Sequence, residues 1–152
     1  MGVRRAAGPA DLAQAARLLY AFNTEYDEPC PEPEALTTRL TELVDDGDTV
    51  VLLSGDEPLG LAVLRLRKSL WLAGQEAYLA ELYVAPAERG HGLGRELLHA
   101  AMDVSRAAGA GYMDLNTGED DTAARRLYEA TGFSSREGRA DGPRNLYYER
   151  EL

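Results

Sequence analysis

The sequence predicts a mixed α/β fold, because helical and strand-like periods alternate along the chain. Two early helices and a hairpin are followed by a strand, a glycine-rich loop, a helix and another strand, and a second hairpin closes the chain. With 152 residues the protein is long enough to build one hydrophobic core. No internal repeat or low-complexity stretch interrupts the sequence, so we expect residues 1–152 to form a single domain.

The first half of the chain predicts two helices and three strands. Residues 12–22 and 36–44 carry apolar side chains at helical spacing. Strands are expected at residues 3–5, 49–53 and 59–66, and a Gly-Asp-Glu-Pro turn joins the last two as a hairpin. Between the two helices, closely spaced prolines exclude regular structure.

The second half predicts a crossover unit, a short helix and a closing hairpin. Strand-like runs, one amphipathic helix and glycines that end each helix define these elements. In order, they are a strand at 76–84, a helix at 92–108, a strand at 112–116, a helix at 122–131, and two strands at 133–137 and 144–152.

The composition excludes several classes of function. The net charge is -10, with 26 acidic against 16 basic side chains, and the phosphates of nucleic acids or anionic membranes would be repelled. No apolar run approaches the about 20 residues of a membrane span, and the start lacks a signal peptide's apolar core, so we expect a cytoplasmic protein. The single cysteine, Cys30, lies between prolines, and we expect neither a disulfide, a cysteine nucleophile nor a metal. The acidity suits either attraction of a cationic small molecule or solubility alone.

Glycines gather where the strand at 76–84 ends and the helix at 92–108 begins. They occupy positions 90, 92 and 94, between Arg89 and Arg95. Unpaired backbone N–H groups and the positive end of the helix dipole meet at such a junction, so it can bind a diphosphate. The spacing fits neither the dinucleotide motif G-x-G-x-x-G nor a nucleotide-triphosphate loop. A glycine-rich turn without a ligand is the alternative.

The segment Arg-Gly-His-Gly-Leu-Gly at 89–94 resembles the signature of the GNAT acetyltransferase superfamily, which is Arg or Gln, two residues, Gly, one residue, then Gly or Ala. The resemblance extends upstream to Glu-Leu-Tyr-Val-Ala-Pro at 81–86 and downstream to residues 124–133, and covers roughly residues 76–133. It implies a central mixed, mostly antiparallel sheet of about six or seven strands flanked by about four helices. It also implies transfer of an acetyl group from acetyl-CoA to an amine.

The resemblance assigns the contacts with acetyl-CoA to several segments. The strand would pair its main chain with the pantetheine arm, the loop would wrap the pyrophosphate, and the end of the next strand would bond to pantetheine amides. These residues are Leu82, Tyr83 and Val84; Arg89, Gly90, His91, Gly92, Leu93, Gly94 and Arg95; and Asn116. Asp121 stands where the family often has Asn. It can cap the following helix equally well, but a carboxylate cannot donate to a pantetheine carbonyl.

Glu81 and Tyr128 are the catalytic candidates. A typical amine with a pKa near 10 is protonated at neutral pH, so a base must take its proton. Glu81 matches a position where many family members keep an acidic residue, acting directly or through water; a surface or salt-bridged role is the alternative. Tyr128 matches the family's tyrosine, which contacts the cofactor and can donate a proton to the CoA sulfur; a packed aromatic is the alternative.

The resemblance places the acceptor between the link of the first two helices and the final hairpin. The candidates are Tyr20, Phe22, Tyr26, Asp27, Glu28 and Glu81, with the turn at 138–143 and Trp71 as further neighbours. Tyrosines beside carboxylates suit a cationic amine such as a polyamine, an aminoglycoside or a peptide N-terminus. A solvated acidic loop over core aromatics fits equally. A catalytically silent acyl-CoA binding module, a longer acyl donor and a homodimer all stay open.

Overall fold

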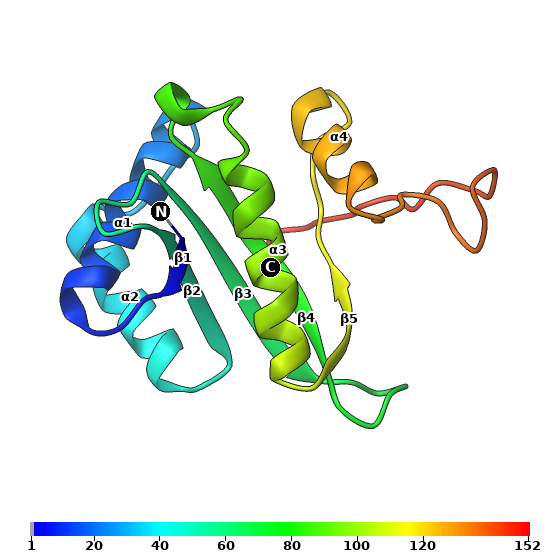
Figure 1. Cartoon of the computed structure of the whole chain (residues 1–152), viewed down its shortest axis with the longest axis horizontal. Coiled ribbons are helices and arrows are strands. Elements are labelled where there is room, and N and C mark those ends of the chain that lie inside the picture. The colour runs from blue at the N-terminus through cyan, green and yellow to red at the C-terminus, as the bar shows by residue number, and fades with distance from the viewer. Residues whose placement is uncertain (1) are drawn as a thin grey trace. The chain divides into compact units, whose positions relative to one another are not determined.

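The computed structural model describes residues 2–152, and Figure 1 shows their mixed α/β arrangement. The predicted fold class is confirmed, but the described residues form five strands rather than six or seven. The elements are β1 (Val3–Arg5), α1 (Pro9–Glu25), α2 (Pro33–Asp45), β2 (Thr49–Ser54), β3 (Gly60–Lys68), β4 (Gln75–Val84), a 3-10 turn (Pro86–Glu88), α3 (Leu93–Ala107), β5 (Ala110–Asp114) and α4 (Thr122–Ala130). They fall into two compact units, one ending at Leu115 and the other running from Asn116 to Leu152.

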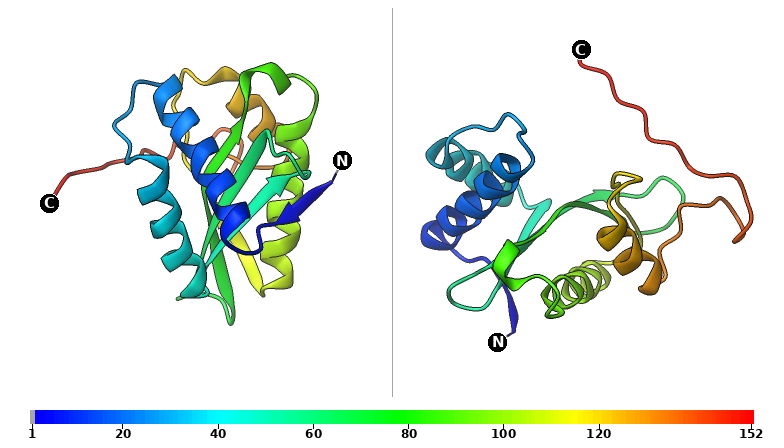
Figure 2. Two further views of the ribbon diagram at one scale, coloured as in Figure 1. Left: turned by 90° about the vertical axis from the view of Figure 1, so that its left-hand side faces the viewer. Right: turned by 90° about the horizontal axis from the view of Figure 1, so that it is seen from above.

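The first unit is one sheet with helices on both faces. Its strands follow the order β1-β2-β3-β4-β5; the first four are antiparallel neighbours, and β5 runs parallel to β4. In Figure 2, α1 and α2 cover one face of this sheet and α3 covers the other. A parallel pair requires a crossover connection, and α3 supplies it between β4 and β5.

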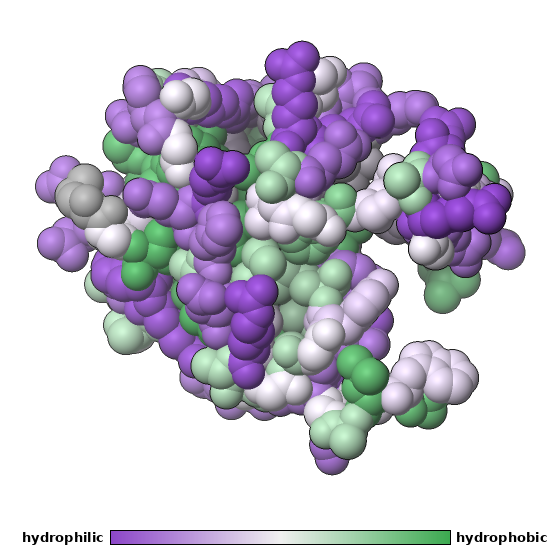
Figure 3. Space-filling view, turned by 45° about the vertical axis from the view of Figure 1, so that its right-hand side comes forward, coloured by the Kyte–Doolittle hydropathy of each residue, from purple (hydrophilic) through white to green (hydrophobic). Residues whose placement is uncertain are grey.

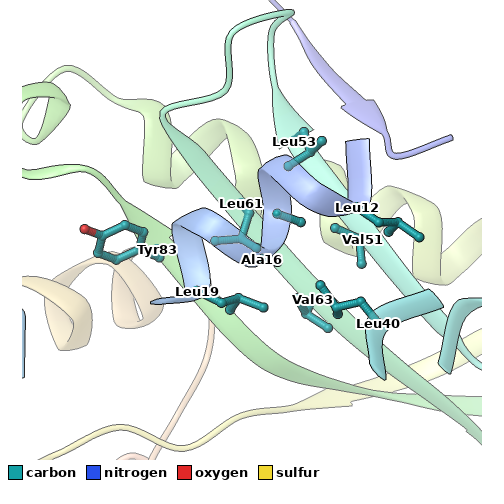
Figure 4. Close-up of a cluster of buried hydrophobic side chains, with 10 residues drawn as sticks. Leu12, Ala16, Leu19, Leu40, Val51, Leu53, Leu61, Val63 and Tyr83 are labelled. Atoms are coloured by element: carbon teal, nitrogen blue, oxygen red, sulfur yellow. The ribbon is translucent and has the colours of Figure 1, made fainter. Parts of the chain in front are cut away.

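A cluster of buried apolar side chains fixes α1 on the sheet. Leu12, Ala16 and Leu19 recur at helical spacing along α1, while Leu61 and Val63 alternate along β3 and meet them. Figure 4 shows these side chains pointing toward one another. Tyr83 from β4, 5% exposed, extends the cluster toward the end of α1, so the core also positions a predicted cofactor strand.

Two irregularities open the outer side of β4 toward its end. Val63 pairs with Glu81 while Leu64 pairs with Leu79, so β4 carries one extra residue beside Glu81, as in a β-bulge. The ladder with β5 ends at the pair Tyr78 and Asp114. Residues 79–84 therefore pair with β3 on one side and leave their other main-chain edge without a strand partner among the described residues.

The second unit contains α4 and the start of a hairpin. Asp121 caps α4 by accepting a hydrogen bond at 3.1 Å from the backbone N–H of Ala124, which confirms the predicted cap. The predicted strands at 133–137 and 144–152 are wrong for these residues, because only an isolated bridge joins Arg136 to Arg144. A strand needs a neighbouring strand edge along its whole length, and next to the local turn only the first backbone hydrogen bonds of that pairing form.

Candidate functional site

The loop between β4 and α3 has the backbone that its glycines predict. Pro86 begins a 3-10 turn directly after β4, where proline is favoured. Gly90 and Gly92 follow with φ angles of 82° and 87°, in the left-handed region that favours glycine. Space is open on the side where a side chain would stand at both positions. The main chain of this loop is therefore accessible to a ligand.

Within residues 2–152, the first turn of α3 presents backbone N–H donors without protein acceptors. Gly92 is the N-cap, and no side chain caps the helix. The helical bonding begins with the N–H of Glu96, which donates to the carbonyl of Gly92 at 3.0 Å. The N–H groups at positions 93–95 precede that bond, as the first donors of every α-helix do. Such a terminus attracts phosphate through both its donors and its dipole.

The side chain of Arg89 turns toward the end of α1. Its guanidinium lies 2.8 Å from the carboxylate of Glu25 and donates from Nε to the carbonyl oxygen of Val84 at 2.9 Å. The hydroxyl of Tyr83 donates to the same carboxylate at 3.2 Å, and the guanidinium lies 5.7 Å from that ring's centroid. Arg89 thus holds the loop against α1 in this structure, and a guanidinium contact with a diphosphate would require it to leave Glu25.

Glu25 is a site residue that sequence reasoning missed. It bonds to Arg89 across 64 positions of sequence, and no periodicity or motif couples residues so far apart. It is the last residue of α1, which continues beyond the apolar spacing that ended at residue 22. The carboxylate links the helix that ends at the predicted acceptor segment to the loop that begins the predicted cofactor segment.

Aromatic side chains gather beside this carboxylate. The ring of Phe22 stacks on Tyr83 with centroids 4.8 Å apart, and Tyr26 meets Phe22 edge-on at 5.5 Å. Asp27 and Glu28 follow as exposed residues, and Asp27 has a positive φ of 54°, which is uncommon outside glycine. The structure therefore brings Phe22 and Tyr26 together with the end of β4.

Two further acceptor candidates lie elsewhere. Tyr20 is half-buried on α1, and its ring takes no part in the stack around Phe22. The prediction that Trp71 neighbours that stack is wrong. Trp71 lies before the first residue of β4, whereas Arg89 lies after the last residue of β4. A strand of this length spans about 33 Å, which is too far for a shared pocket.

Glu81 lies at the bulge of β4 and is half-buried. Burial raises the pKa of this carboxyl above its ordinary value, because the charged form is less well solvated. The thiol pKa of Cys30 is also raised, by burial first and then by the negative charges of Glu32 and Glu81. The segment between α1 and α2 therefore passes within electrostatic range of Glu81. The raised pKa keeps the thiol of Cys30 protonated at neutral pH.

Tyr128 belongs to the second unit, on α4. Its ring meets Phe133 edge-on at 6.0 Å. Burial, with a smaller contribution from the charge of Asp121, raises the pKa of its hydroxyl to about 12. The phenol is therefore protonated at neutral pH and available as a donor. Asn116 opens this unit and Asp121 caps its helix.

Comparison with known proteins decides what this strand, loop and helix belong to. The Acetyltransferase (GNAT) family profile matches residues 13–133, which is most of the chain. The chain belongs to the GNAT family. The match includes Glu81, the glycine loop and Tyr128, and acetyl-CoA is the donor that GNAT proteins use.

Individual relatives support the same assignment. The aminoglycoside N(6')-acetyltransferase type 1 of Stenotrophomonas maltophilia is 31% identical over 140 residues, which are 88% of this chain and 86% of that protein. A mycothiol acetyltransferase of Beutenbergia cavernae is 40% identical over 72 residues, 45% of this chain, and the match spans only 24% of that protein. The crystal structure of a protein from Arthrobacter sp. FB24, described as an acetyltransferase, is 46% identical, covers 100% of this chain and 96% of its own, and has a TM-score of 0.89.

Residues 2–152 contain no group of three or more His, Cys, Asp or Glu side chains that could hold a metal ion. None of their helices combines the length and the apolar character needed to cross a membrane.

Proposed function

We propose that this GNAT protein transfers an acetyl group from acetyl-CoA to an amine of a small molecule or peptide. One observation carries the proposal: β4 leaves its main-chain edge open beside a half-buried carboxylate and ends at the uncapped, glycine-rich start of α3. A pantetheine arm can add to an open strand edge, and a diphosphate suits the helix start.

Each part of this arrangement has a task in the transfer. Main-chain groups of Leu82, Tyr83 and Val84 hold the pantetheine arm, while N–H groups from Gly90 to Arg95 hold the diphosphate. The carboxylate of Glu81 takes the proton of the acceptor amine, directly or through water. The amine lone pair forms the new N–C bond, the C–S bond breaks, and the phenol of Tyr128 donates a proton to the departing sulfur.

The acceptor that suits this site is a cationic amine. Phe22 stacks on Tyr83, whose hydroxyl bonds to the carboxylate of Glu25. The exposed acidic residues Asp27 and Glu28 follow Tyr26 in the chain, which as a whole has a net charge of -10. Aromatic faces and carboxylates both attract ammonium groups. The relative from Stenotrophomonas, an aminoglycoside acetyltransferase, is named for an acceptor of that kind.

Thermal unfolding with acetyl-CoA tests the binding half of the proposal. At about 100 times its dissociation constant, a ligand adds about 2.7 kcal/mol to the free energy of unfolding, so Tm should rise by several degrees. S-acetylpantetheine, which lacks the diphosphate, is the matched ligand and should give a much smaller shift. Equal shifts for both ligands would remove the diphosphate role of the loop, and no shift at millimolar acetyl-CoA would overturn the proposal.

Release of free CoA with a panel of amines tests the catalytic half. We expect thiol release that depends on both acetyl-CoA and an amine, fastest with amines that carry a second positive charge. Binding of acetyl-CoA without release for any amine would leave a silent acyl-CoA binding module instead of an enzyme.

Replacing Glu25 with glutamine should lower KM for acetyl-CoA without slowing the chemical step, because it frees Arg89 to contact the diphosphate. The Arg89 and Glu25 side chains are 42% and 27% exposed, so their ion pair contributes about 0.5–1 kcal/mol, or about two- to fivefold in KM for acetyl-CoA. Glu42→Gln, which breaks an exposed ion pair with Arg39 on α2, is the matched control and should leave KM unchanged. A fall in kcat with constant KM would show that Glu25 acts on the acceptor side instead.

A further inference from the structure

Three groups of the protein hold the guanidinium of Arg89 in this structure. Its Nη2 atom lies 2.8 Å from each carboxylate oxygen of Glu25, and its Nε donates to the carbonyl oxygen of Val84 at 2.9 Å. Its central carbon lies 5.7 Å from the centroid of the Tyr83 ring. Carboxylates, carbonyl oxygens and aromatic faces are the groups that bind cations in proteins. Arg89 therefore marks a place where this chain binds one positive charge.

Two of these groups stay in place without Arg89. The ring of Tyr83 is held in the core cluster beneath α1 and stacks on Phe22 with centroids 4.8 Å apart. The hydroxyl of Tyr83 donates to the carboxylate of Glu25 at 3.2 Å. We call the carboxylate of Glu25 and the ring of Tyr83 the cation site. Departure of Arg89 would leave this site intact but without a positive charge.

The contact of Arg89 with Val84 occupies the open edge of β4. The N–H of Ala85 donates to the carbonyl of Leu59 at 2.7 Å, on the side of β3. Neighbouring residues of an antiparallel strand direct their main-chain groups to opposite edges, so the carbonyl of Val84 faces the side that has no strand partner among residues 2–152. Under the proposed function, the pantetheine arm pairs with this edge. Arg89 and the cofactor therefore compete for the same carbonyl group.

Acetyl-CoA supplies Arg89 with another partner. The proposed function places the diphosphate of the cofactor at residues 90–95, directly after Arg89. Guanidinium groups pair with phosphates through charge-assisted hydrogen bonds, and a diphosphate carries more negative charge than one carboxylate. The side chain of Glu25 is only 27% exposed, and a partly buried carboxylate that loses its cation favours binding of another. Cofactor binding should therefore open the cation site to a positively charged ligand.

We propose that the cation site binds a positive charge of the acceptor other than the reacting amine, and that Arg89 occupies the site until acetyl-CoA binds. Glu81 and Tyr83 stand two positions apart beyond the bulge of β4, and both pair with residues of the core cluster on β3. Their side chains therefore share the face that α1 covers, with Cα atoms about 7 Å apart. An acceptor with two amines at a suitable spacing presents one to Glu81 and the other to Glu25. This inference rests on the proposed function and narrows its acceptors to diamines and larger polycations.

The overall charge of the chain does not locate this site by itself. Hydrophilic side chains are spread over much of the face that Figure 3 shows, and the whole chain has a net charge of -10. A field of this kind raises the local concentration of any cation. It does not favour one spacing of two charges over another. The cation site does, because it lies at a fixed distance from Glu81.

Diamines and monoamines of equal length test the cation site. We compare hexamethylenediamine with hexylamine, and trimethylenediamine with propylamine, as the ratio of their kcat/KM values at saturating acetyl-CoA. In Glu25→Gln the ratio for the six-carbon pair should fall by about two- to fivefold, the contribution of a partly exposed ion pair. The ratio for the three-carbon pair should stay the same, because its two amines are too close together to reach both Glu81 and Glu25. Glu42→Gln, which breaks the exposed ion pair with Arg39, is the matched control and should keep both ratios.

Binding without turnover tests the displacement of Arg89. CoA carries the diphosphate but no acetyl group, so the dissociation constant of hexamethylenediamine can be measured by calorimetry with and without saturating CoA. CoA should lower that constant more in the unmodified protein than in Arg89→Gln, by a further factor of about two to five, because no side chain occupies the cation site of the variant beforehand. An equal change in both proteins would assign the effect to the negative charge of CoA and overturn the displacement.

The cation site and the acetyl transfer fail in different ways. Tighter diamine binding with CoA, but no CoA release from acetyl-CoA with any amine, would support the cation site and overturn the transfer. Acetyl transfer with the same ratio for the six-carbon pair in Glu25→Gln and in the unmodified protein would support the transfer and overturn the cation site.

Discussion

Glu81→Gln is expected to lower kcat/KM for the acceptor by about 10²–10⁴-fold, the usual contribution of a positioned general base. Glutamine keeps the size of the side chain and its place at the bulge of β4 but cannot accept the proton of an ammonium group. The shift in Tm caused by acetyl-CoA should persist, since the proposed function assigns the diphosphate and pantetheine contacts to the main chain. Glu76→Gln, which removes an ion-paired carboxylate from the other end of β4, is the matched control and should retain activity.

The pH dependence of the rate separates a base from a structural carboxylate. The rate should fall as pH drops through the pKa of Glu81, because the base must be ionised. Burial raises that pKa, so the acidic limb of the profile should lie above the ordinary range of glutamate. In Glu81→Gln this limb should vanish, and an unmoved limb would assign the proton transfer to another group.

The same pKa shift predicts an effect on stability with a definite sign. The folded state holds the proton of Glu81 more tightly than the unfolded state, so this proton's contribution to the free energy of unfolding is fully present below the unfolded pKa. The contribution is lost as pH rises through the folded pKa. At neutral pH the ionised, half-buried carboxylate therefore lowers the stability of the folded state. Glu81→Gln should therefore be at least as stable as the unmodified protein at neutral pH, so lost activity could not be blamed on unfolding. Thermal scans across acidic to neutral pH measure this.

Local patterns were enough to predict the elements that build the candidate site. The apolar spacing of Leu12, Ala16 and Leu19 located α1, and glycines with positive φ located the start of α3. Both are features that neighbouring residues determine. β5 was expected at 112–116 and begins two residues earlier, at Ala110, because Gly109 with its φ of 87° ends the preceding helix without further loop.

What the sequence could not supply were pairings between distant residues. Glu25 meets Arg89, and Trp71 lies at the far end of β4 from that pair, although nothing in the spacing of these residues reveals either fact. The closing strands failed for a related reason. Alternation at 144–152 predicts the capacity to form a strand, but the strand itself requires a neighbouring edge, and among residues 2–152 only the first hydrogen bonds of that pairing form. The catalytic roles of Glu81 and Tyr128 stay predictions.

Tyr128→Phe is expected to lower kcat by about 10²-fold while leaving the shift in Tm with acetyl-CoA unchanged, because the variant loses only a hydroxyl proton donor. Burial raises the pKa of the phenol to about 12, so the hydroxyl is protonated at every pH at which the enzyme would be assayed. It can therefore donate a proton without first taking one up. Tyr112→Phe, which removes an exposed hydroxyl from β5, is the matched control and should keep the kcat of the unmodified protein.

The leaving group shows whether Tyr128 acts on the sulfur or only supports α4. When the thioester is made from a more acidic thiol, the thiolate leaves without needing a proton, because a thiol of lower pKa is a better leaving group. If the phenol protonates the sulfur, Tyr128→Phe should lose much less activity with an acetyl thioester of an aryl thiol than with acetyl-CoA. An equal loss with both donors would instead assign the residue a packing role against Phe133, whose ring lies 6.0 Å away, and the proton would have to reach the thiolate from solvent.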